Sequence, residues 1–177
     1  MRSFDDRGQI YTIEGFASAL ILVGVLFFIF QSISVVTPQT EMSADMKLGQ
    51  KAADTLICMD RINEDFNSDL KAGIAMWNGH AANYFSHVYP GEASVRALDA
   101  KIVGMLSNDT SYNVEIAYYD GSAERVIPII IHGLPSDNSV VATRLITLNE
   151  NDTVSPFWSG MGRYPQLIEV RLICWYL

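Results

Sequence analysis

The three histidines are the first candidates for chemistry, because an imidazole ring can exchange protons and bind metal ions near neutral pH. His80, His87 and His132 do not pair with a cysteine or a carboxylate at the spacing of a metal site. We interpret all three as loop histidines, and we expect no metal site and no cofactor.

Motifs of nucleophilic catalysis and of phosphate binding do not occur in the sequence. It contains no G-x-S-x-G, P-loop or G-x-G-x-x-G pattern. Ser136 and Asp137 follow His132 in the segment HGLPSDNS, but this segment is rich in residues that favour turns. A turn is the preferred interpretation, and we expect the protein not to be an enzyme.

Two tripeptides fit the N-x-[ST] pattern of N-glycosylation, namely Asn108-Asp109-Thr110 and Asn151-Asp152-Thr153. Both lie at the ends of predicted helices or strands. Such modification requires export, so Asn108 and Asn151 are glycosylation candidates if this part of the chain is outside the cell.

The two cysteines, Cys58 and Cys174, allow one disulfide bridge. Cys58 lies near the end of a predicted amphipathic helix, and Cys174 shares a strand face with apolar residues. A bridge would close a loop of over a hundred residues and could add about 4 kcal/mol of stability. Two buried free thiols are the open alternative.

Glu14 is directly followed by the uncharged run GFASALILVGVLFFIFQSISVVT, residues 15–37. About 20 apolar residues are enough for a helix to cross a bilayer, so the run predicts a transmembrane helix. It is too long for a cleaved secretory signal, and Ser32-Ile33-Ser34 is a poor cleavage site. Glu14 either lies at the headgroup level or pairs with a positive group inside an apolar assembly.

The net charge of −8 limits the classes of partner. Three of the 20 acidic and two of the 12 basic residues precede residue 41, so most of this charge belongs to the C-terminal part. A nucleic-acid binder needs a basic face, and we therefore expect no nucleic-acid partner.

Helical spacing recurs after Pro38, which could end the first helix or only kink it. Met46, Gly49, Ala53 and Leu56 recur on one face of an amphipathic helix that extends to about Arg61. Further helices are predicted over residues 66–77 and 92–106.

The apolar period changes to two after Asn108, which predicts strands. Asp120-Gly121 is a tight-turn signal, and Pro128 predicts an edge strand for residues 126–131. The sequence therefore predicts an α+β fold in which a long N-terminal helix, apolar and then amphipathic, packs on an antiparallel sheet of about four strands. The four strands are expected at residues 112–119, 126–131, 140–148 and 168–177.

Residues 7–14, Arg-Gly-Gln-Ile-Tyr-Thr-Ile-Glu, together with the apolar run that follows, resemble the start of archaeal type IV pilin-like precursors, which carry a class III signal peptide. The resemblance implies cleavage by a prepilin peptidase after Gly8, which would leave Gln9 as the new N-terminus. It also implies that Glu14 is the acidic residue near the start of the mature helix. The usual pattern places this glutamate fifth after the cut, whereas cleavage before Gln9 makes Glu14 the sixth.

The resemblance implies a pilin-like structural subunit of a cell-surface filament that is inserted in the membrane before assembly. Residues 1–9 would be a cytoplasmic leader, residues 10–38 the transmembrane and filament-core helix, and residues 39–177 an extracellular α+β head. The partners would be membrane lipid, identical or related subunits and the prepilin peptidase. Two alternatives remain, an uncleaved single-pass anchor whose head binds a partner, and an anchored enzyme without a recognisable motif.

Overall fold

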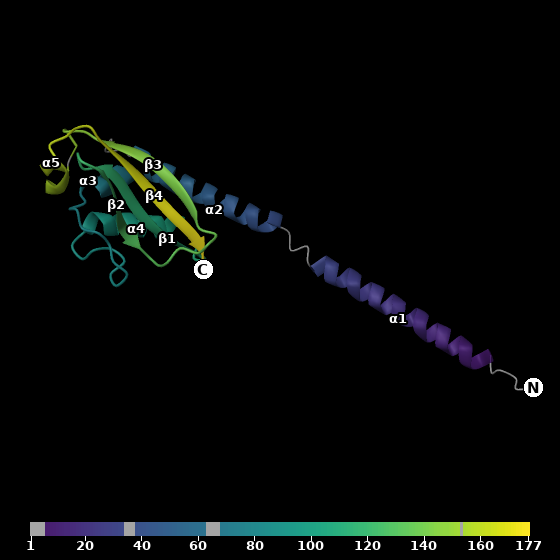
Figure 1. The fold of residues 1–177 in the computed structure, drawn as a ribbon. Helices are drawn as coiled ribbons and strands as arrows, with labels where there is room; N and C mark the ends of the chain where they lie inside the picture. The colour runs from purple at the N-terminus through teal and green to yellow at the C-terminus, as the bar shows by residue number, and fades with distance from the viewer. Residues whose placement is uncertain (1–5, 34–37, 63–67, 153) are drawn as a thin grey trace, which may run out of the picture. The chain divides into compact units, whose positions relative to one another are not determined.

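The structure is a computed structural model, and it describes residues 6–33, 38–62, 68–152 and 154–177. The chain divides into two compact units, Met1–Met42 and Ser43–Leu177. Figure 1 labels the helices and strands of both. We describe each unit by itself and call the second one the head.

Helix α1, Asp6–Ile33, has 28 residues and is therefore about 42 Å long. Between Ile13 and Ile29 its large apolar side chains project in every direction around the helix, and their exposed fractions lie between 45% and 72%. Leu, Ile, Val and Phe all favour burial, so this part of α1 has apolar surface on all sides. In the part of the chain that the structure describes, no helix is both long enough and apolar enough to cross a membrane.

Helix α2, Pro38–Met59, begins at the proline that the sequence left open as a helix end or a kink. Proline suits the first turn of a helix, where its missing N–H has no intrahelical acceptor. The side chains that enter the core recur every three or four residues. They are Leu48, Ala52, Leu56 and Met59.

The predicted apolar face of this helix was partly wrong. Met46 is 70% exposed and Ile57 is 42% exposed, although both are apolar. The true buried face is rotated around the helix axis, and it includes Leu48 and Met59, which the sequence pattern did not single out. Of the predicted face, Leu56 is buried and Ala53 packs partly buried against the core.

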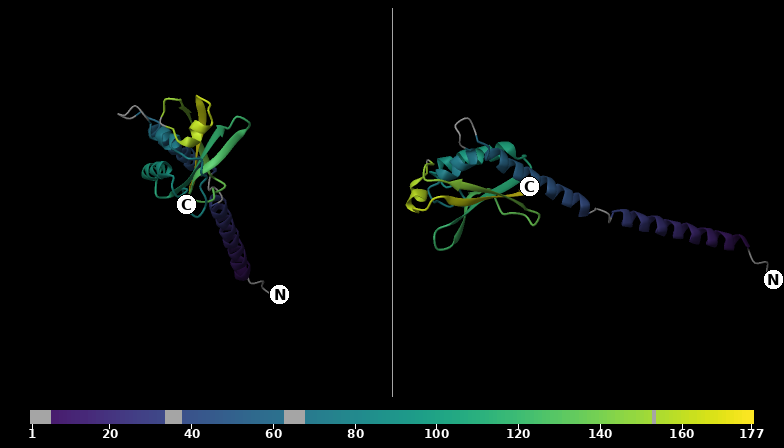
Figure 2. Two further views of the ribbon diagram at one scale, coloured as in Figure 1. Left: turned by 90° about the vertical axis from the view of Figure 1, so that its left-hand side faces the viewer. Right: turned by 90° about the horizontal axis from the view of Figure 1, so that it is seen from above.

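Two further helices cover the sheet. Helix α3, Asp69–Ala75, is shorter than predicted and begins at Ser68, whose hydroxyl accepts a hydrogen bond from the Lys71 amide. Helix α4, Ala93–Met105, matches its prediction and buries Val95, Leu98 and Ile102. Seen from above in Figure 2, the helical layer lies on one side of the sheet.

The sheet has four antiparallel strands in the order β2-β1-β4-β3, which confirms the predicted α+β class and strand number. Strand β2 lies at an edge, as Pro128 predicted, and its register with β1 shifts between Val114 and Glu115. An edge tolerates both a missing N–H and a bulge. The strands are β1 Thr110–Tyr119, β2 Glu124–Ile131, β3 Val140–Leu148 and β4 Gln166–Tyr176.

An aromatic cluster fills the core near a short helix that the sequence did not predict, α5, Pro156–Gly160. Trp77 and Trp158 are fully buried, with ring centroids 5.7 Å apart. The Trp158 ring also contacts Tyr118 and Phe157 edge-on, at 5.2 and 4.9 Å. Both indole N–H groups donate to backbone carbonyls, so no indole nitrogen of the pair is buried without an acceptor.

Gly79 tests how tightly this cluster is packed. It has φ +90°, and a Cβ there would lie 2.4 Å from Cδ2 of Phe157. We expect Gly79→Ala to lower the free energy of unfolding by about 2–4 kcal/mol, from backbone strain and the displaced ring. Gly91→Ala is the matched control, because Gly91 has φ +107° but open space around its Cβ position. Urea titration should show that the control lowers the free energy of unfolding by only about 1–2 kcal/mol. Equal losses of stability in the two variants would contradict the packing argument.

Candidate functional site

The residues that the resemblance singled out all lie on α1. Gly8 and Gln9 fall within the first turns of this helix. Glu14 is exposed, and its backbone carbonyl accepts a hydrogen bond from the Ser18 hydroxyl at 2.9 Å. Glu14 is therefore a charged residue that directly precedes the uncharged part of α1.

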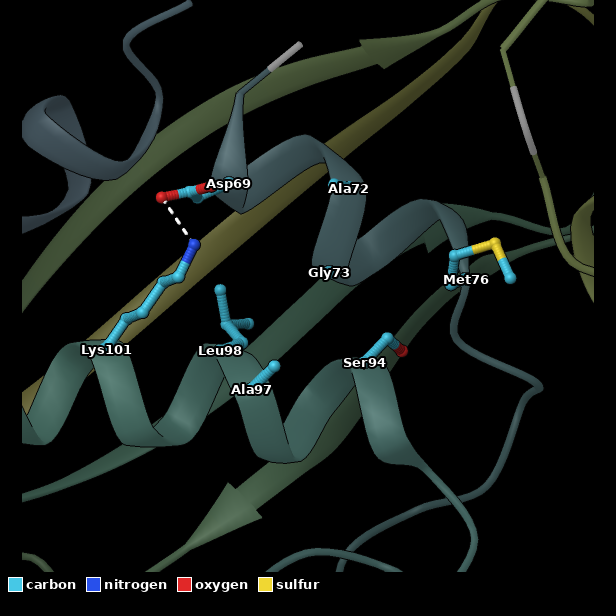
Figure 3. A pocket seen from close by; sticks show the side chains of 8 residues that line it. All are labelled: Asp69, Ala72, Gly73, Met76, Ser94, Ala97, Leu98 and Lys101. Carbon is cyan, nitrogen blue, oxygen red and sulfur yellow. Dashed lines mark ion pairs between the residues drawn. The ribbon is translucent and has the colours of Figure 1, made fainter. Parts of the chain in front are cut away.

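A hollow of about 250 Å³ lies between α3 and α4 (Figure 3). Lys101 reaches across it from α4 and pairs with Asp69 at 2.7 Å, as the dashed line shows. Gly73 lets the two helices approach closely, since a Cβ there would lie 3.3 Å from the Leu98 side chain. The two charges are paired and, apart from the Ser94 hydroxyl, the rest of the lining is apolar, so this hollow is a seam between packed helices.

A polar cluster of different character lies where α4 meets strands β1 and β2. The carboxylate of Asp99 accepts hydrogen bonds from the Tyr112 hydroxyl at 2.5 Å and from Nε2 of His132 at 2.8 Å. The rings of His132 and His87 stack with centroids 5.1 Å apart. Nδ1 of His87 lies 2.8 Å from the carbonyl oxygen of Ile131.

The electrostatics of this cluster follow from burial and hydrogen bonding. Burial raises the pKa of Tyr112 far above its usual value, and the hydrogen bond to Asp99 adds to this effect. Burial alone would raise the pKa of Asp99, but hydrogen bonds from His132 and Tyr112 outweigh it and lower that pKa. Asp99 is therefore a carboxylate and Tyr112 a neutral donor near neutral pH.

The third histidine forms a separate contact. Nδ1 of His80 lies 2.9 Å from Oε1 of the buried Glu92, and its ring stacks on Tyr89 at 4.3 Å. All three histidines lie outside the helices and strands, as interpreted, but each has a carboxylate or carbonyl partner that sequence spacing did not indicate. The partners His132 and Asp99 are 33 residues apart, and only the fold brings them together.

Neither metal binding nor nucleophilic catalysis finds support in this cluster. Within residues 6–33, 38–62, 68–152 and 154–177, no group of three or more His, Cys, Asp or Glu side chains could hold a metal ion. The hydroxyl nearest the stacked histidines along the chain, that of Ser86, donates to Asn83 at 3.0 Å. A serine nucleophile would instead donate to a histidine.

The disulfide that the sequence allowed is not formed. Cys58 and Cys174 are both free thiols, the first exposed and the second buried. The physical reason is the rotated face of α2: Leu56 and Met59 point into the core, which turns Cys58 outward. The alternative of two buried thiols holds only for Cys174.

The two thiols should therefore differ in reactivity. Burial raises the pKa of Cys174 from 9.0 to about 12, so its thiol stays protonated and enclosed. We expect N-ethylmaleimide to modify one cysteine in the folded protein and both in urea, as counted by intact-mass spectrometry. The native state binds the Cys174 thiol proton more tightly than the unfolded chain does. The stability that the protonated thiol contributes is therefore lost as the pH rises from about 9 towards 12. Two rapid modifications of the folded protein would contradict the assignment.

Both glycosylation candidates are accessible. Asn108 lies in an exposed turn between α4 and β1, and Asn151 lies in an exposed turn after β3. Thr110 of the first sequon begins β1, whereas Thr153 of the second lies outside the described residues. The exposed amide side chains fit modification of a folded head.

The fold and these sites define an α+β protein that combines a helix with apolar surface on all sides and a folded head. The chain belongs to the DUF7288 family, a family of unknown function whose model matches residues 7–169. It is similar to an uncharacterized protein of Archaeoglobus fulgidus, with 25% identity over 97% of this chain and 93% of the relative. No solved structure gives a significant match.

Proposed function

We propose that the protein is a pilin-like structural subunit of an archaeal cell-surface filament, inserted in the membrane before assembly. The observation that carries this proposal is helix α1, whose apolar side chains are exposed all around between Ile13 and Ile29. Such a surface needs lipid or other apolar helices around it. The uncharged run of the sequence continues through residues 34–37, which lie outside the described residues.

In this proposal the apolar helices bundle in the filament core and the heads form its surface. Lipid is as apolar as the helix, so exchanging lipid contacts for helix contacts gives little hydrophobic gain. Close packing and polar pairing must supply the preference for the filament. Glu14 is the charged group best placed to provide such a pairing.

The partner that we propose for Glu14 is the amine created on a neighbouring subunit when the leader is cut after Gly8. Cleavage would make Gln9 the N-terminus and place a positive charge near the start of the same helix layer. Residues 10–38 would then be the membrane and core segment, and the head would lie outside the cell, where Asn108 and Asn151 could be glycosylated.

A second candidate is an uncleaved single-pass anchor whose head binds a partner outside the cell. One observation favours it: α1 begins at Asp6, so Gly8 and Gln9 lie inside a helix. Proteases cut most readily in exposed, flexible segments, and a helical site would have to open before cleavage.

Filament isolation combined with N-terminal sequencing separates the two candidates. The pilin-like proposal predicts this chain in sheared filaments, with Gln9 or Ile10 as its first residue. A membrane-bound chain that keeps Met1 and is missing from every filament preparation would favour the anchor. Intact mass of the same native material tests the two sequons, because an unmodified mass excludes glycosylation.

A further inference from the structure

A second hollow on the head, of about 290 Å³, contains the stacked histidines. The loop that includes Ser86 and His87 forms one wall, α4 forms another, and His132 follows the end of β2. His87 has φ +51°, in the left-handed region that residues other than glycine rarely adopt. Such a conformation at a polar hollow is a reason to look for a ligand.

Arg96 gives this hollow a cation that forms no ion pair with Asp99, the carboxylate of the same wall. Among the described residues, no hydrogen bond or ion pair involves its guanidinium group. The other charged residue of the wall, Asp99, is already engaged by Tyr112 and His132. An exposed guanidinium is a strong donor to carboxylate, sulfate and phosphate oxygens.

The hydrogen bonds fix which ring nitrogens carry hydrogen. A carbonyl and a carboxylate can only accept, so Nδ1 of His87 donates to Ile131 and Nε2 of His132 donates to Asp99. In the neutral rings the remaining nitrogens, Nε2 of His87 and Nδ1 of His132, carry lone pairs. Protonation converts both into N–H donors on residues that line the hollow.

We propose that this hollow is a proton-linked binding site for a small oxyanion, that is, for the carboxylate, sulfate or phosphate group of a ligand. Arg96 supplies a fixed charge, and His87 and His132 supply further charges and donors when the pH falls. The proposal concerns the head alone and does not depend on filament assembly.

The charge balance supports acid-dependent binding. With both rings neutral, Arg96 and Asp99 cancel, whereas with both rings protonated the hollow has a net charge of +2. The other titratable groups packed against the cluster are Tyr112 from β1 and Cys174 from β4, and burial raises the pKa of both, so both are neutral here. Two positive rings 5.1 Å apart repel each other, and a bound anion relieves that repulsion.

The size of the hollow favours a small ligand. Pockets for drug-sized ligands occupy about 300–1,000 Å³, so this one lies at the lower end. The chain as a whole has a charge of −8, which disfavours unspecific anion binding elsewhere. The hollow therefore has a size that suits a small oxyanion. With both rings protonated it also has a positive charge, on a chain whose net charge is negative.

Calorimetric titration of the full-length protein in detergent with sodium sulfate tests the proposal. Sulfate keeps its charge between about pH 5.5 and 7.5, the range in which imidazole ordinarily titrates, so a change in affinity reports on the protein. We expect a dissociation constant of about 1 mM at the acid end and binding at least about tenfold weaker at the other end. Sodium chloride at equal ionic strength is the blank.

Two pairs of matched variants locate the site. Arg96→Gln should weaken sulfate binding at both pH values, and His87→Gln should remove much of its pH dependence. Arg125→Gln and His80→Gln are the controls, because Arg125 pairs with Asp120 and His80 with Glu92, away from the hollow. Sulfate binding that is absent, independent of pH, or unchanged in Arg96→Gln would overturn the proposal.

The source of the oxyanion is addressed by a parallel titration with glucose 6-sulfate. Equal affinity for the free ion and the ester identifies a site for a free anion. Tighter binding of the ester by about tenfold or more identifies a site for an anionic saccharide. Histidine ring resonances followed by NMR should shift for His87 and His132 in either case, and not for His80.

Discussion

The Glu14→Gln variant is expected to accumulate, insert and fold its head as the parent protein does, yet to assemble few or no filaments. Glutamine keeps the size and the hydrogen-bonding capacity of the side chain and removes only its charge. Glu14 lies on α1, in a different compact unit from the head. The head should therefore keep its stability.

The loss of filaments follows from the cost of burying charge. An unpaired carboxylate in an apolar helix bundle is strongly unfavourable, so the proposed assembly requires a positive partner for Glu14. A glutamine cannot attract that partner and would leave the neighbouring amine buried without a counter-charge. Removal of one member of a buried ion pair typically costs about 3–5 kcal/mol.

The measurement is a count of filaments by negative-stain electron microscopy, with membrane fractionation and circular dichroism as checks on insertion and folding. Glu150→Gln is the matched control, since Glu150 is exposed on the head after β3. It should assemble as the parent protein does. Parental filament numbers from Glu14→Gln would refute the pairing, as would a chain that assembles with its leader uncut.

Replacement of Trp158 by alanine should lower the free energy of unfolding of the head by about 3–5 kcal/mol. The side chain is 0% exposed, and Nε1 donates to the carbonyl of Ile74 at 2.8 Å. The change removes three ring contacts, opens a cavity and takes away one of the two donors to that carbonyl, which also accepts from the Trp77 amide at 3.1 Å. The total free energy of unfolding of a typical domain is only about 5–15 kcal/mol, so the variant should be close to unfolding at ambient temperature.

Urea denaturation followed by far-ultraviolet circular dichroism measures this loss without relying on tryptophan fluorescence. Phe85→Ala is the matched control, because Phe85 is 100% exposed in its loop. The control should change stability by no more than about 0.5 kcal/mol. Similar losses for the two variants would show that Trp158 is not the centre of the core.

The sheet could be predicted from the sequence because its pattern is local. Alternating side chains of β1 and β4, such as Val114, Ile116, Val170 and Leu172, are fully buried, and a period of two has a single structural meaning. Pro128 placed β2 at an edge for a reason that needs no knowledge of its neighbours. Chain order alone, however, does not reveal that β4 lies between β1 and β3.

The face of α2 could not be predicted as reliably. Its apolar residues surround more of the helix than the core covers, so Met46 and Ile57 gave the same signal as Leu48 and Met59. Packing against the rest of the head then buries the apolar residues along one side of the helix and leaves the others exposed. The exposed position of Cys58 follows from that selection, and this is why the disulfide could not be decided from spacing.

The polar cluster escaped prediction because its members are distant in sequence. Asp99, Tyr112 and His132 come from α4, β1 and the end of β2. A carboxylate inside a predicted helix and a histidine in a turn carry no sign of mutual contact. The turn at residues 136–139 was recognised, but what His132 contacts before it depends on how the helical layer is placed on the sheet.

The position of β4 has a consequence for the order of events during synthesis. Among the strands that the structure describes, this one comes last in chain order, yet it supplies the pairing partner for both β1 and β3. A nascent chain that has emerged only as far as β3 can form the β1–β2 hairpin but no closed core. The sheet of the head therefore cannot close before β4 is available to pair with both of its neighbours.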